Sequence, residues 1–203
     1  MGRFWGCVWI IEYQKGRLPH LHLLVVLHSE DRFLTPERID EIISADLLSN
    51  IDDPTGALRE IIGSSMVHGP CRPNHLHAPC MINSSSIRPS CSKRFPKSFQ
   101  ESTIVQEGGY PLYRRRSNGV TYKGKNGFVY DNRWVVPHNL YLSWRYQAHI
   151  NVEVYTSVQG IKYIHKYIYK GSDRTTLQLQ ETDNADEVKR HLQGRYIGPC
   201  EAI

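Results

Sequence analysis

One stretch of the chain combines a turn, two histidines and a long apolar run: Gln14-Lys15-Gly16-Arg17-Leu18-Pro19-His20-Leu21-His22-Leu23-Leu24-Val25-Val26-Leu27. The apolar run after Gly16 and Pro19 predicts a β-strand over residues 20–28. Side chains alternate between the two faces of a strand, so His20 and His22 point the same way. Neutral imidazole is a common ligand of divalent metals, and the pair therefore predicts a metal site.

The residues before this turn predict the partner strand. Residues 4–14 are rich in aromatic and β-branched side chains, and the short turn over residues 15–19 predicts an antiparallel hairpin. Glu12 and Gln14 share one face of the first strand, near the turn that leads to the histidines. Either residue could supply a third metal ligand.

Further elements follow from local patterns. Thr35, as a cap before Pro36, predicts a helix that carries apolar residues as far as Leu47. Residues 57–66 suggest another short helix, and the alternation over 148–155 predicts a half-buried strand. Helices are also expected over about 157–170 and 185–193. We expect one domain over residues 1–203, of α+β class.

The segment from His68 to about Arg133 has a different texture, with many Gly, Pro, Ser and Asn residues. We interpret it as a loop-rich insertion with short strands, irregular in structure. It contains cysteines and histidines that could hold a structural Zn²⁺, although their gaps are wider than usual zinc-ligand spacings. The alternative is a set of reduced cysteines and loop histidines. These residues are Cys71, Cys80, Cys91, His68, His75 and His77.

The expected helix over 157–170 carries two tyrosines one turn apart. Tyr163, Tyr167 and Lys170 share a stripe, and Lys166 flanks it, while the isoleucines form a separate core-facing stripe. The alternative is an amphipathic helix whose tyrosines pack at the rim of the core. A phenol has a pKa of about 10 and is a poor nucleophile at neutral pH unless a metal and a cation assist it. Together with the paired histidines, the pattern predicts metal-assisted attack of tyrosine on a phosphodiester.

Composition sets broad limits on partners and compartment. The net charge of +5 over 203 residues favours an acidic partner only weakly. Residues 110–125 combine three arginines, two lysines and three tyrosines, which resembles a single-strand DNA-binding surface, with an ordinary exposed loop as the alternative. Five cysteines without a signal peptide indicate a reducing compartment. No apolar run approaches the roughly 20 residues that span a bilayer, so we expect a soluble intracellular protein.

Several motifs, in order along nearly the whole chain, resemble the helitron helicase-like N-terminal domain. This is the replication-initiator nuclease module of Helitron rolling-circle transposases, in the HUH endonuclease superfamily. The matching segments are Glu12-Tyr13-Gln14-Lys15, Leu18-Pro19-His20-Leu21-His22, Val67-His68-Gly69-Pro70-Cys71, Cys91-Ser92-Lys93-Arg94-Phe95-Pro96-Lys97, Gly109-Tyr110-Pro111-Leu112-Tyr113-Arg114-Arg115-Arg116, Lys162-Tyr163-Ile164-His165-Lys166-Tyr167-Ile168-Tyr169-Lys170-Gly171 and Tyr196-Ile197-Gly198-Pro199-Cys200-Glu201-Ala202-Ile203.

The resemblance implies a fold and an activity. The fold would be a central antiparallel sheet with flanking helices. The activity would be nicking of single-stranded DNA through a 5′-phosphotyrosine link, followed by transfer of that strand to a free 3′-hydroxyl in rolling-circle transposition. It also implies a nuclear location. Full-length relatives carry an upstream segment and a fused helicase, both missing from this sequence, so we expect a fragment.

The resemblance also assigns roles. His20 and His22 become ligands of Mg²⁺ or Mn²⁺, with Gln14 the preferred third ligand and Glu12 the alternative. Tyr163 and Tyr167 become the two nucleophiles. Lys166 or Lys170 would stabilise the phenolate or the transition state.

Two other functions stay open. One is a catalytically dead DNA-binding remnant of such a transposase. The other is a metal-dependent hydrolase that uses the histidines and a water molecule, with structural tyrosines.

Overall fold

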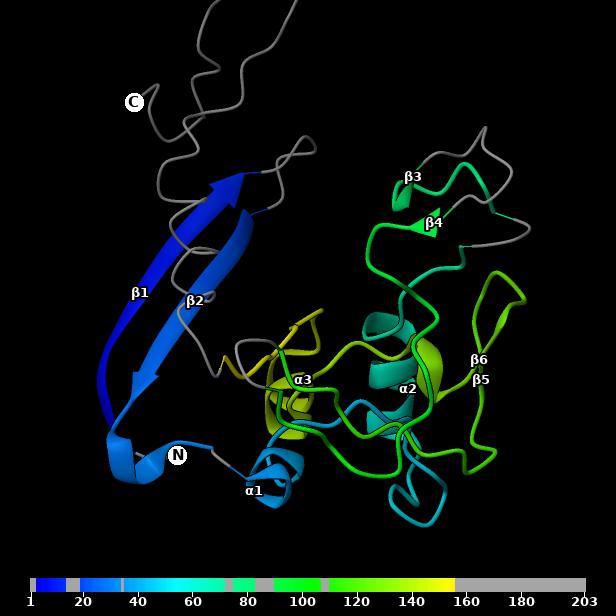
Figure 1. Cartoon of the computed structure of the whole chain (residues 1–203). Helices are drawn as coiled ribbons and strands as arrows, with labels where there is room; N and C mark the ends of the chain where they lie inside the picture. The colour runs from blue at the N-terminus through cyan, green and yellow to red at the C-terminus, as the bar shows by residue number, and fades with distance from the viewer. Residues whose placement is uncertain are drawn as a thin grey trace, which may run out of the picture. The chain divides into compact units, whose positions relative to one another are not determined.

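The computed structural model describes residues 3–13, 19–33, 35–71, 75–82, 90–106 and 110–155 (Figure 1). The described residues belong to two compact units, divided between Arg32 and Phe33. The helices expected over residues 157–170 and 185–193 lie outside the described residues.

The first unit contains the predicted hairpin. Strands β1 (Phe4–Tyr13) and β2 (Pro19–Leu27) pair antiparallel and form one long ribbon (Figure 1). The Cα partner of Glu12 is His20, and that of Ile10 is His22. The predicted strand bounds are confirmed to within about one residue, because both the alternating pattern and the turn are local signals.

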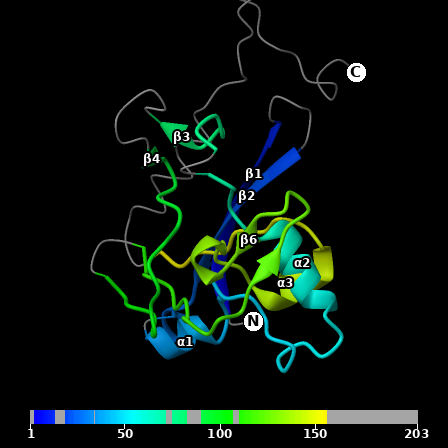
Figure 2. The same ribbon diagram turned by 90° about the vertical axis from the view of Figure 1, so that its right-hand side faces the viewer.

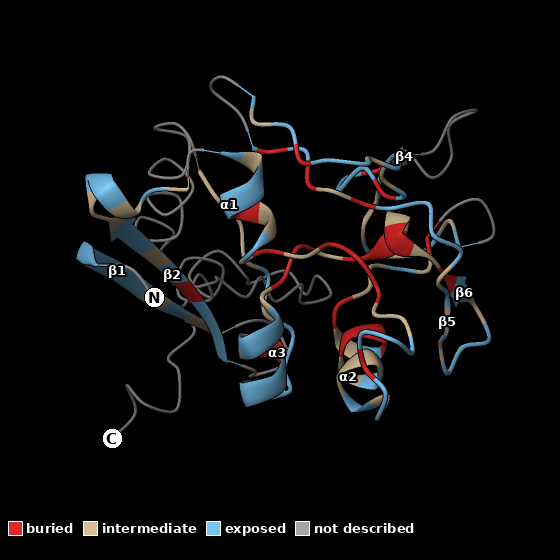
Figure 3. Ribbon diagram, turned by 90° about the horizontal axis from the view of Figure 1, so that it is seen from below, coloured by how far each residue is buried: buried red, intermediate tan, exposed pale blue. Residues whose placement is uncertain are grey.

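Apolar side chains on the hairpin are largely exposed. The burial view shows β1 and β2 almost entirely in the exposed and intermediate classes (Figure 3). Trp5, Trp9 and Leu21 are each more than half exposed, whereas His22 is buried at 8% exposure. An isolated two-stranded hairpin is marginally stable in water. Among the described hairpin residues, the most buried side chain is thus a polar one, His22, at the predicted metal site.

The second unit begins with a short helix, α1 (Pro36–Asp40). The predicted cap is confirmed, because the Thr35 side chain accepts a hydrogen bond from the Arg38 backbone N–H at 3.4 Å. The helix ends sooner than its apolar pattern suggests. Ser44 and His138 exchange two backbone hydrogen bonds of 2.8 and 2.9 Å, which draws the chain into an extended bridge.

Helix α2 (Ala57–Ser65) confirms the second predicted helix. It starts after Gly56, whose φ of 71° favours glycine. Helix α3 (Leu140–Tyr146), which was not predicted, is capped by the Asn139 side chain accepting from Leu142 N–H at 2.9 Å. Helices α2 and α3 contact each other and lie side by side in Figure 2. No helix of the described residues is long and apolar enough to cross a membrane.

The remaining regular elements are very short. Strands β3 (Met81–Ile82) and β4 (Ser90–Cys91) form one antiparallel pair, and β5 (Tyr122–Lys123) and β6 (Val129–Tyr130) form another. Two 3₁₀ turns, η1 (Ser29–Asp31) and η2 (Asn132–Trp134), complete the described elements. The described residues form a mixed α+β structure with separate two-stranded antiparallel sheets. The larger central sheet stays a prediction.

The strand predicted over residues 148–155 is wrong. Its backbone donors bond singly to unlike partners: Val152 N–H to the Pro137 carbonyl at 3.0 Å, and Val154 N–H to the Tyr113 hydroxyl at 2.8 Å. Val152 and Val154 still pack on the apolar cluster around Ile39. The alternating pattern therefore indicated burial on one side of the chain, although this segment pairs with no described strand.

The buried side chains of the second unit form three clusters. Irregular segments supply much of this core, as the buried positions between the helices show in Figure 3. The clusters consist of Cys71, Cys91, Phe95, Tyr130 and Trp134; of Ile39, Ile43, Ala45 and Tyr113; and of Leu47, Ile62, Met66 and Val135. Residues within 68–133 thus share buried clusters with residues on either side of that segment.

Candidate metal centres

The hairpin brings together an acid and two imidazoles. Glu12 lies opposite His20 in the β1–β2 register, and His22 follows two residues later on the same face. The His22 Nε2 atom lies 3.2 Å from a Glu12 carboxylate oxygen. The two imidazole rings stack with centroids 4.6 Å apart. One ligand atom from each residue lies within 4.8 Å of the others, so the three could hold a metal ion.

These donors combine hard and intermediate ligands. Carboxylates suit Mg²⁺ and Mn²⁺, whereas imidazoles suit later transition metals. Mn²⁺ accepts both types, and Mg²⁺ would keep several waters at such a site. Glu12 is the acid beside the imidazoles in the structure. Gln14, the preferred third ligand of the prediction, lies outside the described residues.

The four predicted catalytic residues also lie outside the described residues. They are Tyr163, Lys166, Tyr167 and Lys170. Their roles as nucleophiles and charge-stabilising groups stay predictions.

A second candidate centre lies in the loop-rich segment and consists of His68, Cys71, Cys80 and Cys91. One ligand atom from each lies within 4.8 Å of the others. The Met81–Cys91 pairing of β3 with β4 brings Cys80 beside Cys91, and Ser92 N–H donates to the Cys80 carbonyl at 2.7 Å. Cys71 and Cys91 are buried in the core. This cluster could hold a metal ion, as the sequence suggested.

His68 is positioned by contacts on both its backbone and its ring. Its N–H donates to the Trp134 carbonyl at 2.8 Å, and its ring stacks on Phe95 with centroids 4.3 Å apart. The Nε2 atom is then 3.3 Å from the Cys91 sulfur. His75 and His77 are exposed in a turn and do not belong to the cluster. Of the three histidines proposed from the sequence, His68 is the one beside the thiols.

The protonation of the thiols is uneven. Burial raises the pKa of Cys71 to about 12, and burial also raises the pKa of Cys80. Burial opposes ionisation of Cys91 as well, but backbone N–H groups of Phe95 and Lys93 donate to its sulfur and lower its pKa overall. Cys91 is therefore the thiol that ionises first. Burial favours the neutral thiol at the other two.

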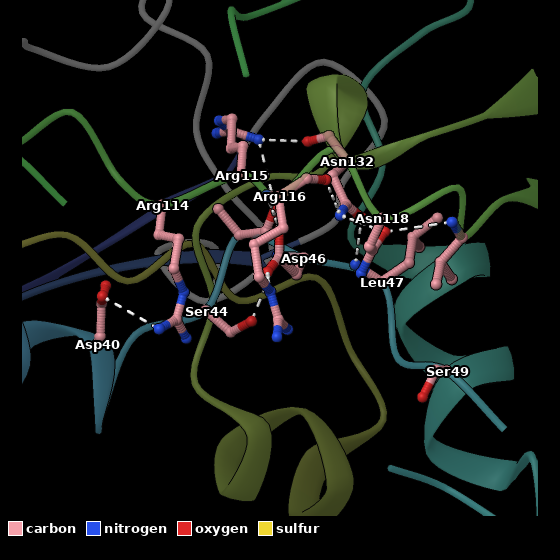
Figure 4. Close-up of polar contacts among 12 residues, drawn as sticks. Asp40, Ser44, Asp46, Leu47, Ser49, Arg114, Arg115, Arg116, Asn118 and Asn132 are labelled. Atoms are coloured by element: carbon pink, nitrogen blue, oxygen red, sulfur yellow. Dashed lines mark hydrogen bonds and ion pairs between the residues drawn. The ribbon is translucent and has the colours of Figure 1, made fainter. Parts of the chain in front are cut away.

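The three arginines of the triplet form ion pairs and hydrogen bonds with other residues of the second unit. Arg114 pairs with Asp40 at 3.3 Å, and Arg116 pairs with the buried Asp46 at 2.7 Å (Figure 4). Arg115 is only 4% exposed and donates to the carbonyls of Asn132, at 2.8 Å, and Val135. The interpretation of the triplet as a phosphate-facing surface is wrong for Arg115, because its guanidinium is inside the fold.

Asn132 connects the same network to the backbone at Leu47. Its side-chain oxygen accepts from Leu47 N–H at 2.7 Å, while its amide nitrogen donates to the Arg116 carbonyl at 2.8 Å and to Asn118 at 3.2 Å (Figure 4). Asp46 and Asn132 are both almost fully buried. Buried polar groups with complete hydrogen bonding specify one arrangement of the chain. The basic run therefore acts, in this part of the molecule, as a structural element.

Comparison with known proteins identifies no family for this chain. A scan against protein-family models finds no match to this chain, and a search of curated proteins finds no similar sequence.

Proposed function

We propose that this chain is a metal-dependent, single-stranded DNA endonuclease and strand transferase of the Helitron rolling-circle type. The observation that carries the proposal is the grouping of Glu12, His20 and His22 on one face of the hairpin. The sequence resemblance supplies the rest: the tyrosine pair, the lysines and the order of the motifs. By the same resemblance the protein would act on DNA in the nucleus, and its longer relatives would add a helicase.

In this reaction Glu12, His20 and His22 would hold a divalent ion beside the scissile phosphate. The ion, Mg²⁺ or Mn²⁺, would supply Lewis-acid polarisation of a phosphate oxygen. Tyr163 or Tyr167 forms a bond from its phenolic oxygen to phosphorus and gives its proton to solvent. The bond from phosphorus to the 3′ oxygen breaks, and that oxygen takes a proton to become a free 3′-hydroxyl. Lys166 or Lys170 would stabilise the phenolate and the transition-state charge.

Glu12 has a defined part in this proposal. Its carboxylate is within hydrogen-bonding distance of His22, so it would both orient that ring and offer an oxygen to the ion. A carboxylate ligand favours Mg²⁺ and Mn²⁺ over the softer metals that two imidazoles alone would prefer. By the alternation of the sequence, Gln14 would share a face with Glu12 and offer a neutral oxygen.

The proposal is tested by cleavage of labelled single-stranded oligonucleotides with Mg²⁺ or Mn²⁺. Polarisation of a phosphate by a bound ion is worth several kcal/mol, so Glu12→Gln and His20→Ala should each slow cleavage about 100-fold or more. His75→Ala, at an exposed turn histidine outside the group, is the matched control and should cleave normally. Folding of each variant is checked by circular dichroism.

Each alternative gives a different result. Salt-sensitive DNA binding without cleavage, from a folded wild-type protein and several oligonucleotides, would support the dead DNA-binding remnant and overturn the nuclease. Cleavage that survives Tyr163→Phe with Tyr167→Phe would support a metal-dependent hydrolase using water. Equal cleavage by wild type, Glu12→Gln and His20→Ala would remove the hairpin site from the reaction.

A further inference from the structure

We propose that His68, Cys71, Cys80 and Cys91 form a closed structural zinc site that is separate in chemistry and role from the hairpin site. This site would form whether or not the protein is a nuclease. The bound ion would help the loop-rich part of the second unit attain its fold.

The donor set fits zinc in number and type. Three sulfurs and one imidazole nitrogen make the Cys₃His combination of structural zinc sites, which are tetrahedral and have no position left for water. Mg²⁺ and Ca²⁺ prefer oxygen ligands and would bind this set poorly. The described cluster contains no carboxylate. A closed, sulfur-rich site is suited to a structural role.

The spacing of the donors also fits. With zinc-to-ligand bonds of about 2.0–2.3 Å, the ligand atoms of a tetrahedral site lie about 3.4–3.8 Å from each other. The measured separation of the Cys91 sulfur and the His68 Nε2 atom is 3.3 Å, and all four ligand atoms lie within 4.8 Å of one another. The groups can therefore reach a common ion with small side-chain adjustments.

The surroundings of the cluster would stabilise a bound zinc ion with three thiolates. Such a centre carries one net negative charge, from the Zn²⁺ and the three sulfurs. Backbone N–H groups of Lys93 and Phe95 donate to the Cys91 sulfur, as outer hydrogen bonds to thiolate ligands do. The charges of Lys93 and Lys97 act on His68, and the Lys97 ammonium lies 5.0 Å from the centre of the Phe95 ring. These cations would offset the negative charge.

Among its described residues, the segment around the cluster has little other regular structure to hold it. Strands β3 and β4 are two residues each, and the ligands come from three separate places along the chain. Cys71 and Cys91 are at the same time members of the buried cluster with Phe95, Tyr130 and Trp134. A metal that joins them would fix both the loops and this part of the core. Its binding free energy would then contribute to folding.

A disulfide is the competing explanation for close cysteines. The described cysteines of the cluster are free thiols in the structure. A disulfide between any two would leave the third thiol beside His68, and it would not use the imidazole. Zinc accounts for all four side chains.

The test is the metal content of the purified 203-residue chain, prepared under reducing conditions and measured by elemental analysis. We expect one zinc per chain, and a Co²⁺-substituted protein with the visible bands of a tetrahedral site and a near-ultraviolet sulfur-to-cobalt band. Cys71→Ser and Cys91→Ser should lose the zinc. Cys7→Ser removes an exposed cysteine outside the cluster and should keep it, as should His20→Ala.

Two further measurements test the zinc site if the serine variants do not fold. Cys80→His exchanges one zinc ligand for another at the least buried thiol and should retain the metal. A strong chelator added to the wild type should lower its unfolding temperature, and Zn²⁺ should restore it. Wild-type protein that is folded, reduced and free of zinc, or zinc that persists in both serine variants, would overturn the proposal.

Discussion

At the scale of single residues, the three consecutive arginines have three different environments. Arg115 is buried and bonds to main-chain carbonyls, whereas Arg114 and Arg116 are partly exposed and pair with carboxylates. Burial lowers the pKa of Arg115 to about 10, against the raising effect of Asp46. A buried guanidinium is tolerated here because the carbonyls that accept its hydrogen bonds replace the water that it has lost.

We expect Arg115→Ala to destabilise the protein by about 2–4 kcal/mol, since it leaves buried carbonyls without donors. Arg114→Ala is the matched control: its ion pair with Asp40 is partly exposed, so the loss should be below about 1 kcal/mol. Urea unfolding of both variants measures the difference. Equal losses would contradict a buried structural role for Arg115.

The burial of His138 predicts that the stability of the protein depends on pH. His138 is fully buried, its Nδ1 lies 2.9 Å from the Val136 carbonyl, and burial lowers its pKa, assisted by the charge of Arg115. The unfolded chain then binds a proton more readily than the folded chain. Stability should therefore fall as the pH drops below about 6.5, the ordinary histidine value.

The measurement is urea unfolding at pH 7.5 and pH 5.5, for wild type and His138→Gln. Other histidines contribute to the wild-type trend, so the difference between the two proteins is the quantity of interest. We expect a smaller loss of stability on acidification for His138→Gln. An identical pH dependence would show that His138 does not titrate in unfolding.

At the scale of elements, α2 packs closely on the β5 strand. A Cβ atom on Gly63 would lie 2.3 Å from the Tyr122 ring, and Tyr122 also donates a hydrogen bond from its hydroxyl to Glu60 at 2.9 Å. The glycine therefore serves close packing of a helix on an aromatic ring, in a helix where alanine would be intrinsically favoured by about 1 kcal/mol.

Gly63→Ala should destabilise the protein by about 1–3 kcal/mol despite its better helix propensity. Ser64→Ala, on the exposed side of the same helix, should change stability by less than about 0.5 kcal/mol. Thermal unfolding compares the two. In Tyr122→Ala protein the cost of Gly63→Ala should shrink, because the ring is gone; an undiminished cost would point to another cause.

Local signals predicted some of these elements and missed others. The hairpin follows from alternation and a turn, and the Thr35 cap and α2 follow from short-range patterns. Helix α3 was missed because Tyr141, Trp144 and Tyr146 favour strands as amino acids and are all more than half exposed, which leaves little apolar stripe to detect. The cap by Asn139 was the one helical signal available.

The candidate metal centres likewise combine local signals, which the sequence predicts, with long-range contacts, which it does not. His20 and His22 are neighbours in sequence, and Glu12 is carried to them by a hairpin register. The choice of His68 over His75 and His77 depends on its stacking with Phe95 and its hydrogen bond to Trp134, which are long-range contacts. The burial of Arg115 depends likewise on distant carbonyls. Runs of charged residues are usually exposed to solvent, so the sequence predicted an exposed side chain where Arg115 is buried.

At the scale of the whole molecule, the described residues contain two groups that could hold a metal ion, of contrasting chemistry and one in each compact unit. The hairpin centre has a carboxylate and two imidazoles, which suits an ion that polarises a substrate. The cysteine centre is sulfur-rich and largely buried, which suits an ion that holds the fold. Chelation should therefore have two separable effects, loss of cleavage and loss of stability, restored by Mn²⁺ and Zn²⁺ respectively.

In the proposed reaction, tyrosine attacks DNA with the aid of a metal ion at the hairpin site. Its most direct test is the intact mass of the protein after incubation with single-stranded DNA and Mn²⁺ under denaturing work-up. We predict a covalent protein–DNA species whose peptide map carries the nucleotide on Tyr163 or Tyr167. This species should be lost in the Tyr163→Phe/Tyr167→Phe protein and strongly reduced in Glu12→Gln. Folded wild-type protein that forms no adduct with any of several oligonucleotides, or an adduct at another residue, would contradict the account.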